Sequence, residues 1–188
     1  MTQIAIVYHS GYGHTLRQAE AVAEGVRKVA GAEALLVPVE QAESHWPALA
    51  AADGIIFGTP TYMGSVSAPF KAFMDATSKI WYDRGWKDKI AAGFTNSASQ
   101  SGDKLNTLIQ LAIFAAQHGM MWVSLGLLPG NNSSAGSPED LNRLGSFLGA
   151  MAQSNADAGP DAAPPAADLR TAAALGERVA TAATRWRA

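Results

Sequence analysis

Short continuous runs of apolar residues alternate along this chain with longer segments in which apolar residues recur every three or four positions. Continuous runs are typical of parallel strands that helices bury on both faces. They predict strands at residues 4–8, 33–39, 54–59, 89–95 and 120–126. The periodic segments predict helices at residues 15–30, 44–52, 68–80, 103–118 and 168–186.

This alternation predicts an α/β fold, a doubly wound five-stranded parallel sheet with helices on both faces and right-handed crossovers. With 188 residues, the chain is expected to form a single domain, 1–188. Residues 129–167 are rich in turn-forming residues and alanine without periodicity, and predict a long irregular excursion before the C-terminal helix. This excursion is either a surface loop, a flap over the site or an oligomer contact.

Composition narrows the range of partners. Charged residues make up 16% of the chain and the net charge is −2, so nothing favours nucleic acid or an anionic membrane. Cysteine is absent, which excludes disulfides, thiolate metal sites and thiol nucleophiles. No run approaches the roughly 18 apolar residues of a membrane span, and the first residues lack the pattern of a signal peptide. We expect a soluble, cytoplasmic protein.

Three loops rich in small polar residues follow predicted strands, at residues 9–15, 60–67 and 96–102. In open α/β sheets, ligands bind beyond the carboxyl ends of the strands, where the strand order reverses. The three loops therefore predict one binding site at this edge. A metal site is not expected, because His9, His14 and His45 share no common face.

The first loop, SGYGHT, leads directly into a predicted helix. A helix N-terminus offers about four unpaired N–H groups and a positive dipole end, which together favour a phosphate. Gly11 and Gly13 let the backbone turn around the anion, and Ser10 and Thr15 add hydroxyl groups. The loop lacks the lysine of nucleoside-triphosphatases and the third glycine of dinucleotide-binding motifs. It predicts a phosphate monoester site; the alternative is a plain strand-to-helix turn.

The motifs SGYGHT, GTPTYMG and FTNSAS together resemble the flavodoxin-like flavoproteins, and are most similar to the WrbA-type NAD(P)H:quinone oxidoreductases. The resemblance extends over about residues 2–126. It implies the strand order 2-1-3-4-5, with FMN phosphate in the first loop and the flavin ring between the other two. It also implies NAD(P)H as reductant, a quinone-like acceptor, and a homodimer or homotetramer.

The resemblance assigns roles to residues of this sequence. Those expected to hold the phosphate are Ser10, Gly11, Tyr12, Gly13, His14 and Thr15. Those expected along the N5 edge of the flavin are Pro60, Thr61, Tyr62, Met63 and Gly64. Those expected along its pyrimidine side are Asn96, Ser97, Ala98, Ser99, Gln100 and Ser101. Trp81 is expected on the substrate side of the site, and His118 near the flavin.

Several residues keep a second interpretation. His14 is either a phosphate neighbour or a first-turn residue facing solvent, and Trp81 and Trp86 either wall a quinone pocket or pack in the core. His118 follows the fourth helix, so within one subunit it should lie a strand length of roughly 17–20 Å from the flavin. It either reaches the flavin of a neighbouring subunit or ends its helix with Gly119 as the cap.

Three functional classes follow from these patterns. The first is an FMN-dependent enzyme that passes two electrons from NAD(P)H to a quinone-like acceptor. The second is a flavodoxin-type electron carrier, and the third is an FMN-binding module with a regulatory role. Carriers of this kind tend to be strongly acidic and to flank the flavin with aromatic residues. The net charge of −2, together with Met63 and Ala98 beside the flavin, favours the enzyme.

Overall fold

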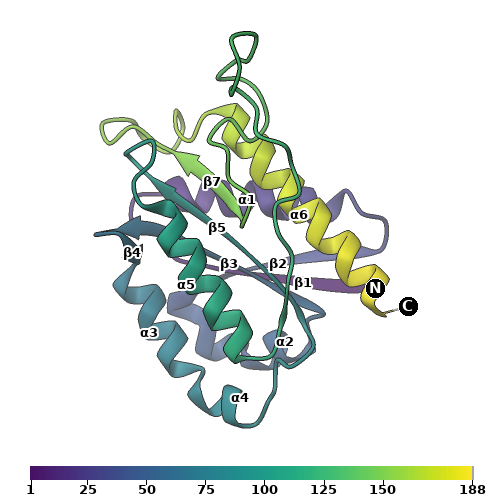
Figure 1. Cartoon of the computed structure of the whole chain (residues 1–188). Coiled ribbons are helices and arrows are strands. Elements are labelled where there is room, and N and C mark those ends of the chain that lie inside the picture. The colour runs from purple at the N-terminus through teal and green to yellow at the C-terminus, as the bar shows by residue number, and fades with distance from the viewer. Residues whose placement is uncertain (188) are drawn as a thin grey trace.

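A parallel sheet runs through the centre of the molecule and helices cover both of its faces (Figure 1). The computed structural model describes residues 1–187. Its main strands, in spatial order, are β2 (Ala32–Pro38), β1 (Thr2–Tyr8), β3 (Gly54–Tyr62), β5 (Ile90–Ser97) and β6 (Met121–Trp122). This confirms the flavodoxin-like order 2-1-3-4-5, because β5 and β6 are the fourth and fifth strands of that scheme.

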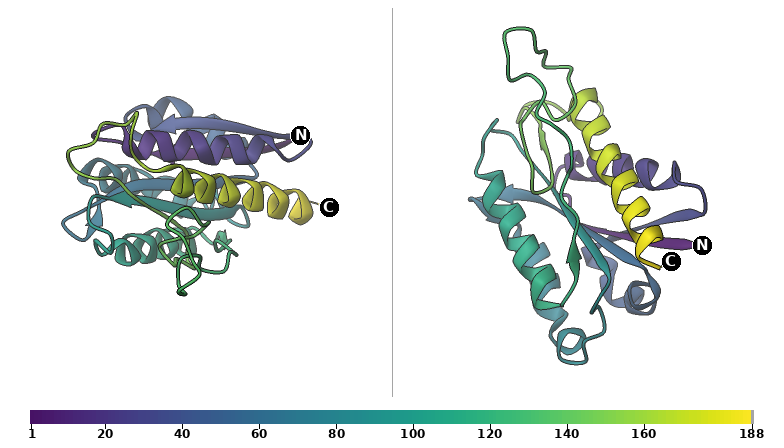
Figure 2. Two further views of the ribbon diagram at one scale, coloured as in Figure 1. Left: turned by 90° about the horizontal axis from the view of Figure 1, so that it is seen from above. Right: turned by 45° about the vertical axis from the view of Figure 1, so that its right-hand side comes forward.

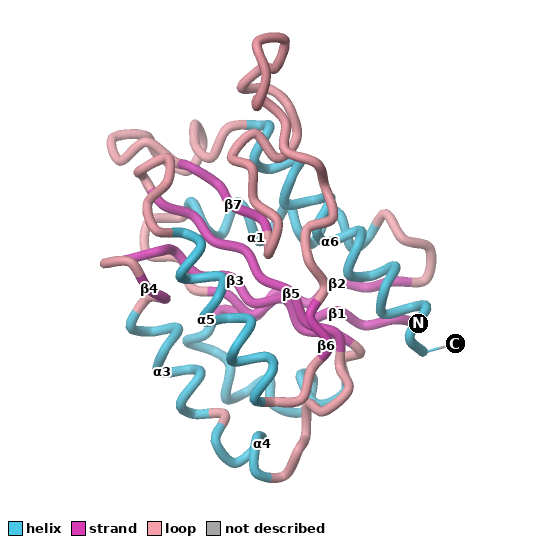
Figure 3. The backbone as a smooth tube through the Cα atoms, viewed as in Figure 1, coloured by secondary structure: helices cyan, strands magenta, loops and turns pink. Residues whose placement is uncertain are grey.

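The helices follow the predicted alternation closely (Figure 3). They are α1 (His14–Arg27), the 3₁₀ helix η1 (Val39–His45), α2 (Trp46–Ala51), α3 (Ala68–Ala76), α4 (Ser78–Tyr82), α5 (Lys104–Gln117) and α6 (Ala166–Arg187). The helix predicted at residues 68–80 is divided at Thr77, whose ψ angle is 1°. The Thr77 hydroxyl donates to the carbonyl of Met74 at 2.7 Å, a local bond that competes with the regular helix.

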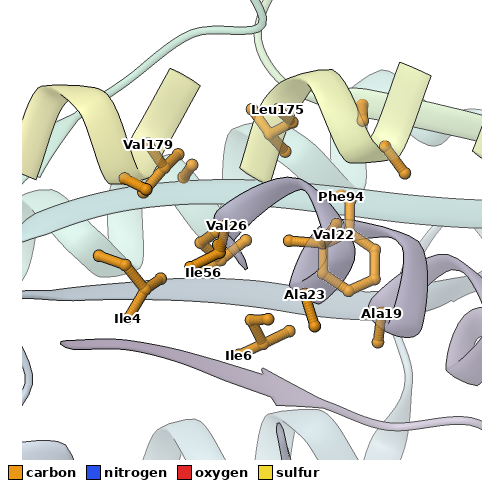
Figure 4. Packing of buried hydrophobic residues seen from close by; sticks show 14 of the residues in the cluster. Ile4, Ile6, Ala19, Val22, Ala23, Val26, Ile56, Phe94, Leu175 and Val179 are labelled. Carbon is orange, nitrogen blue, oxygen red and sulfur yellow. The ribbon is translucent and has the colours of Figure 1, made fainter. Parts of the chain in front are cut away.

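Helices α1 and α6 lie side by side on one face of the sheet (Figures 2 and 4). Figure 4 shows side chains of both helices above apolar residues of β1, β3 and β5; those labelled include Val22, Val26, Leu175, Val179, Ile4, Ile56 and Phe94. The helix backbones come into direct contact, because a Cβ at Gly25 would collide with the carbonyl of Ala173, and one at Gly176 with that of Val22. Both glycines are therefore required by close packing.

The opposite face is packed mainly by aromatic side chains beneath α3 and α5. Phe57 of β3 lies at the centre, with ring centroids 5.2 Å from Phe114 and 6.3 Å from Trp86. Trp86 is buried, so it belongs to this core rather than to the wall of a quinone pocket. Aromatic pairs at such distances add about 0.5–1.5 kcal/mol each beyond the burial of their area.

The fifth strand is divided, and here the sequence prediction was wrong in detail. Strand β6 ends at Trp122, and a second segment, β7 (Ala150–Gln153), pairs in parallel with the far half of β5. The Trp122 ring lies across Gly93 of β5, where a Cβ would stand 2.8 Å from it, and its Nε1–H donates to the carbonyl of Leu148 at 2.9 Å. The irregular excursion predicted at residues 129–167 therefore starts at residue 123 and contains a strand. Its tip projects beyond the sheet (green in Figure 1).

Candidate functional site

The carboxyl ends of β1, β3 and β5 surround a cavity of about 880 Å³. This volume lies toward the upper end of the range of about 300–1,000 Å³ for small-molecule sites. Most of the predicted site residues line it: Tyr12, His14, Thr15, Pro60, Thr61, Tyr62, Met63, Gly64, Asn96, Ser97, Ala98 and Ser99. The three loops identified from the sequence thus meet at one place.

The remaining predicted residues do not line the cavity. Ser10, Gly11 and Gly13 belong to the first loop without lining the cavity, and Gln100 and Ser101 are exposed on the third loop. His118 and Trp81 lie elsewhere in the molecule. Seven further residues line the cavity without having been assigned a role: Gly102 and Asp103 at the end of the third loop, and Ser154, Ala156, Asp157, Ala158 and Gly159. The last five belong to the excursion, which agrees with its interpretation as a flap over the site.

The first loop is closed by the segment that follows β7. Gly13 precedes α1 with a φ angle of 87°, which favours glycine, and a Cβ there would lie 2.9 Å from the ring of Pro160. His14 Nε2 lies 2.8 Å from the carbonyl oxygen of Ala158, so its N–H donates to that carbonyl. The His14 ring therefore neither faces open solvent nor is free to turn, since the segment after β7 fixes it at the cavity wall.

The second loop is a tight turn between β3 and β4 (Ser65–Val66). Met63 and Gly64 have φ angles of 49° and 76°, the left-handed conformation required at both central positions of a type I′ turn. The turn is held by Asn106 of α5, whose Nδ2–H donates to the carbonyl of Gly64 at 2.6 Å. The Met63 side chain is fully exposed, and the Tyr62 phenol lies over Gly11 of the first loop.

Buried hydroxyl groups stabilise the floor of the cavity. The Thr61 hydroxyl lies 2.8 Å from those of both Thr95 and Thr107, which links β3, β5 and α5. At the end of β5, the Ser154 hydroxyl donates to Oδ1 of Asn96 at 2.9 Å. Because these bonds satisfy polar groups that are removed from water, they keep the carboxyl edge rigid at little cost in stability.

Lys104, the first residue of α5, lies directly behind the third loop and is fully buried. Its ammonium group donates to the Ser97 hydroxyl and to the Ser99 carbonyl, both at 2.7 Å. Burial lowers the pKa of Lys104 to about 8, with Asp168 acting in the opposite direction and Arg143 adding to the shift. No sequence pattern singles out this residue.

His118 lies at the other end of α5, and its placement corrects the prediction that it reaches the flavin. Its side chain is only 4% exposed and packs between the rings of Trp86 and Phe114, with centroid distances of 4.6 and 4.8 Å. The Thr77 hydroxyl donates to a carbonyl, so Nε2–H of His118 must donate to Thr77 at 2.9 Å. Burial lowers the pKa of His118 to about 4.

A buried ring cannot reach into a neighbouring subunit, so we assign His118 to the core. Gly119 follows it with a φ angle of 72°, as expected for a helix cap, although the neutral ring supplies no positive charge there. Trp81, on α4, is half exposed and borders a separate cavity of about 280 Å³ together with His118. The structure therefore does not bring Trp81 to the carboxyl-edge cavity of its own chain.

A serine, a histidine and a glutamate beside the first loop have the composition of a hydrolase triad, but the serine is not accessible to a substrate. His9 Nδ1 lies 2.8 Å from the Ser67 hydroxyl, and His9 Nε2 lies 3.7 Å from Glu40. Ser67 is completely buried, so no substrate reaches it. Across residues 1–187, no three metal-binding side chains gather into a cation site, and no helix is long and apolar enough to cross a membrane.

Residues 7–133 match the family model of the NADPH-dependent FMN reductases. Among curated proteins, the chain is 49% identical to "Flavodoxin FldP" of Pseudomonas aeruginosa over 184 residues, which cover 96% of each chain. It is 39% identical to "NAD(P)H dehydrogenase (quinone)" of Geobacter metallireducens over 145 residues, which cover 65% of this chain and 71% of that protein.

Among solved structures, a flavodoxin described as a WrbA-like protein from Agrobacterium tumefaciens matches with a TM-score of 0.78 and 45% identity. The match covers 98% of this chain and 99% of that one. An archaeal flavodoxin matches with a TM-score of 0.67 at 19% identity, and it supports the fold alone.

Proposed function

This chain belongs to the NADPH-dependent FMN reductase family and is an FMN-binding, flavodoxin-like flavoprotein, and we propose that it passes two electrons from NAD(P)H to a quinone-like acceptor. The observation that carries this proposal is the open side of the cavity. The third loop offers only small side chains there, among them Ser97, Ala98 and Ser99, and no aromatic ring. A flat substrate therefore has room to lie against the flavin.

The first loop fits the phosphate of FMN. The first turn of α1 leaves backbone N–H groups without helical partners, and Gly13 allows the backbone to curve around an anion. The Ser10 hydroxyl already accepts the N–H of Leu16 at 3.0 Å, which leaves its own proton free to donate. Thr15 lines the cavity and adds a second hydroxyl. The cradle holds the phosphate with neutral donors.

The second and third loops fit the two sides of the flavin ring. When bound, FMN supplies the hydride and electron chemistry, while the protein orients the ring and excludes competing reactions. The turn at Met63 and Gly64 would hold the N5 edge. The backbone N–H groups of residues 97–101 would stabilise negative charge on the pyrimidine side.

NAD(P)H and the quinone would use the same open face in turn, which predicts ping-pong kinetics. The test is to saturate the protein with FMN, add NADH or NADPH without oxygen, and then add benzoquinone. We expect the flavin absorbance to bleach with the reductant and to return with the quinone. The proposal would be contradicted if NAD(P)H reduced the flavin only in the presence of a partner protein. It would also be contradicted if benzoquinone did not reoxidise the reduced flavin.

A second candidate is a flavodoxin-type electron carrier. It is favoured by the similarity of nearly the whole chain to a protein named as a flavodoxin. A carrier passes single electrons to protein partners, so it requires a stable semiquinone. It should not turn over with NAD(P)H in the absence of a protein partner. The kinetic test above and the semiquinone yield therefore separate the two candidates.

We also propose that the protein is a homodimer or homotetramer. Leu105, Ile109 and Ile113 form an exposed apolar row on one face of α5, which supports contact with a second copy. Light scattering should give a mass of two or four chains, and Ile109→Lys should lower it. A monomer at micromolar concentration would contradict this part of the proposal.

A further inference from the structure

The buried ammonium group of Lys104 has no anion of its own. Across residues 1–187, no ion pair within 4.0 Å includes it, and its hydrogen bonds go to a hydroxyl and a carbonyl of the third loop. A buried cation without a counter-charge is costly, because the charge has been removed from water. Such a group is stabilised when a negative charge arrives nearby.

The charged groups around Lys104 do not neutralise it. Asp168 of α6 is a buried acid whose charge acts on Lys104, but Arg143 binds both of its carboxylate oxygens, at 2.7 and 2.8 Å. Asp103 and Asp157 are exposed at the cavity, where water screens them. The N-terminus of α5 adds its positive dipole end at the same place as Lys104.

The third loop is held at a fixed position relative to this charge. Lys104 binds it at Ser97 and Ser99, and Nε2–H of Gln153 donates to the carbonyl of Ala98 between them at 3.0 Å. Gln153 is in turn fixed by its backbone N–H, which donates to Asp168 at 2.9 Å. The charge therefore lies immediately behind the segment that lines the cavity.

We propose that Lys104 is a positioning residue whose buried charge favours the reduced flavin, which is negatively charged, over the neutral oxidised flavin. The inference rests on the placement of the flavin ring at the third loop, as set out in the proposed function. Charge close to the pyrimidine side is one of the means by which proteins tune flavin chemistry. Two unit charges about 10 Å apart, at an effective dielectric constant of about 20, change an equilibrium more than tenfold.

The test is the two-electron midpoint potential of bound FMN at pH 7, measured against reference dyes with dithionite. Neither NAD(P)H nor quinone is used, so an enzyme and a carrier give the same result, and failure of the proposed function leaves the test intact. Lys104→Met should lower the ratio of affinities for reduced and oxidised FMN at least tenfold, which shifts a two-electron potential by about −30 mV. Lys104→Arg, which keeps the charge, should preserve the wild-type potential.

Lys89→Met is the matched control. Lys89, like Lys104, makes two hydrogen bonds, here to the carbonyls of Ala50 and Ala52, but it lies at the opposite edge of the sheet. It should leave the potential unchanged. If Lys104 had a purely structural role, Lys104→Met would lower the affinities for oxidised and reduced FMN equally and leave the potential unchanged. An unchanged potential in Lys104→Met would therefore overturn the proposal. An equal shift in Lys89→Met would also overturn it.

A second measurement keeps the proposal testable if Lys104→Met fails to bind FMN. Burial places the pKa of Lys104 at about 8, and the negative charge on reduced flavin should raise that pKa. Reduction of the wild-type protein should then take up more protons per flavin at pH 9 than at pH 7, by up to one, as followed with a pH indicator. Equal proton uptake at the two pH values would overturn the proposal.

Discussion

The two ends of helix α5 each bury an ionisable side chain, and the two side chains differ in their charge and in their neighbours. Lys104, at the N-terminal end, is bonded to the loop that lines the cavity and keeps a charge at neutral pH. His118, at the C-terminal end, lies between aromatic rings and is neutral. Burial of an ionisable side chain therefore does not by itself identify a functional residue. The groups around the side chain show whether it acts on the cavity or belongs to the core.

The difference assigns separate tasks to the two ends of the molecule. The N-terminal end of α5 faces the cavity and should govern the affinity and potential of the flavin. The C-terminal end belongs to the aromatic core and should govern stability. Changes at one end should leave the property of the other end unaltered. The predictions for the cavity concern FMN binding, and those for His118 concern stability.

The largest effect is expected from removing the phosphate of the cofactor. Riboflavin should bind at least a hundredfold more weakly than FMN, because charge-assisted hydrogen bonds contribute about 1.5–3 kcal/mol each. Calorimetry gives both affinities directly. Thr15→Ala should lower the affinity for FMN by only part of this factor, since backbone donors make most of the contacts. It should leave the affinity for riboflavin unchanged. Equal affinity for the two ligands would show that the first loop does not recognise phosphate.

Acid should act at the opposite end, through His118. The unfolded chain takes up a proton on this ring near pH 6.5, whereas the folded protein does so only near pH 4. The contribution of His118 to stability is therefore complete above pH 6.5 and is lost as the pH is lowered toward 4, by about 3 kcal/mol in total. Urea unfolding at pH 7 and pH 4.5 measures the loss.

His118→Phe is the variant that isolates this effect. It keeps a ring between Trp86 and Phe114 but cannot titrate, so its stability should depend less on pH over the same interval. Its affinity for FMN at pH 7 should stay within about twofold of the wild type, because the ring is remote from the cavity. A large loss of FMN affinity in this variant would return His118 to the cofactor site.

A smaller effect is expected from two glycines with similar backbone angles. Gly13 and Gly31 have φ angles of 87° and 77°, so alanine should cost each about 1 kcal/mol in stability. Only Gly13 has a close neighbour, Pro160, whereas a Cβ at Gly31 meets nothing within 4 Å. Gly13→Ala should therefore weaken FMN binding about tenfold, and Gly31→Ala should not. Similar affinities in the two variants would mean that the segment after β7 does not close the phosphate loop.

Much of the fold and of the cavity was predictable because it depends on local pattern. Continuous apolar runs identify buried strands, and small polar residues mark the loops that must meet at the carboxyl edge. Strand β7 was not predictable, because four residues among turn formers carry no pattern of their own. They form a strand because β6 ends at Trp122 and leaves the second half of β5, Phe94–Ser97, free to pair with them.

The two ends of α5 show the same limit at single residues. A lysine at the start of a predicted helix is usually exposed, so nothing in the sequence marks Lys104 as buried. When buried, its ammonium group donates to Ser97 and Ser99, and the charges of Arg143 and Asp168, which are distant in the sequence, act on its pKa. His118 was placed near the flavin by the family resemblance, with a helix cap as the alternative, while its neighbour Trp86 comes from another segment of the chain.

The most direct test of the central claim is an anaerobic reductive titration of the FMN-loaded protein, followed by absorbance. Oxidised flavin should pass to the fully reduced form with little semiquinone at any stage, because the open cavity suits hydride transfer, in which two electrons move together. A large and stable semiquinone population would contradict the claim and identify the protein as a one-electron carrier.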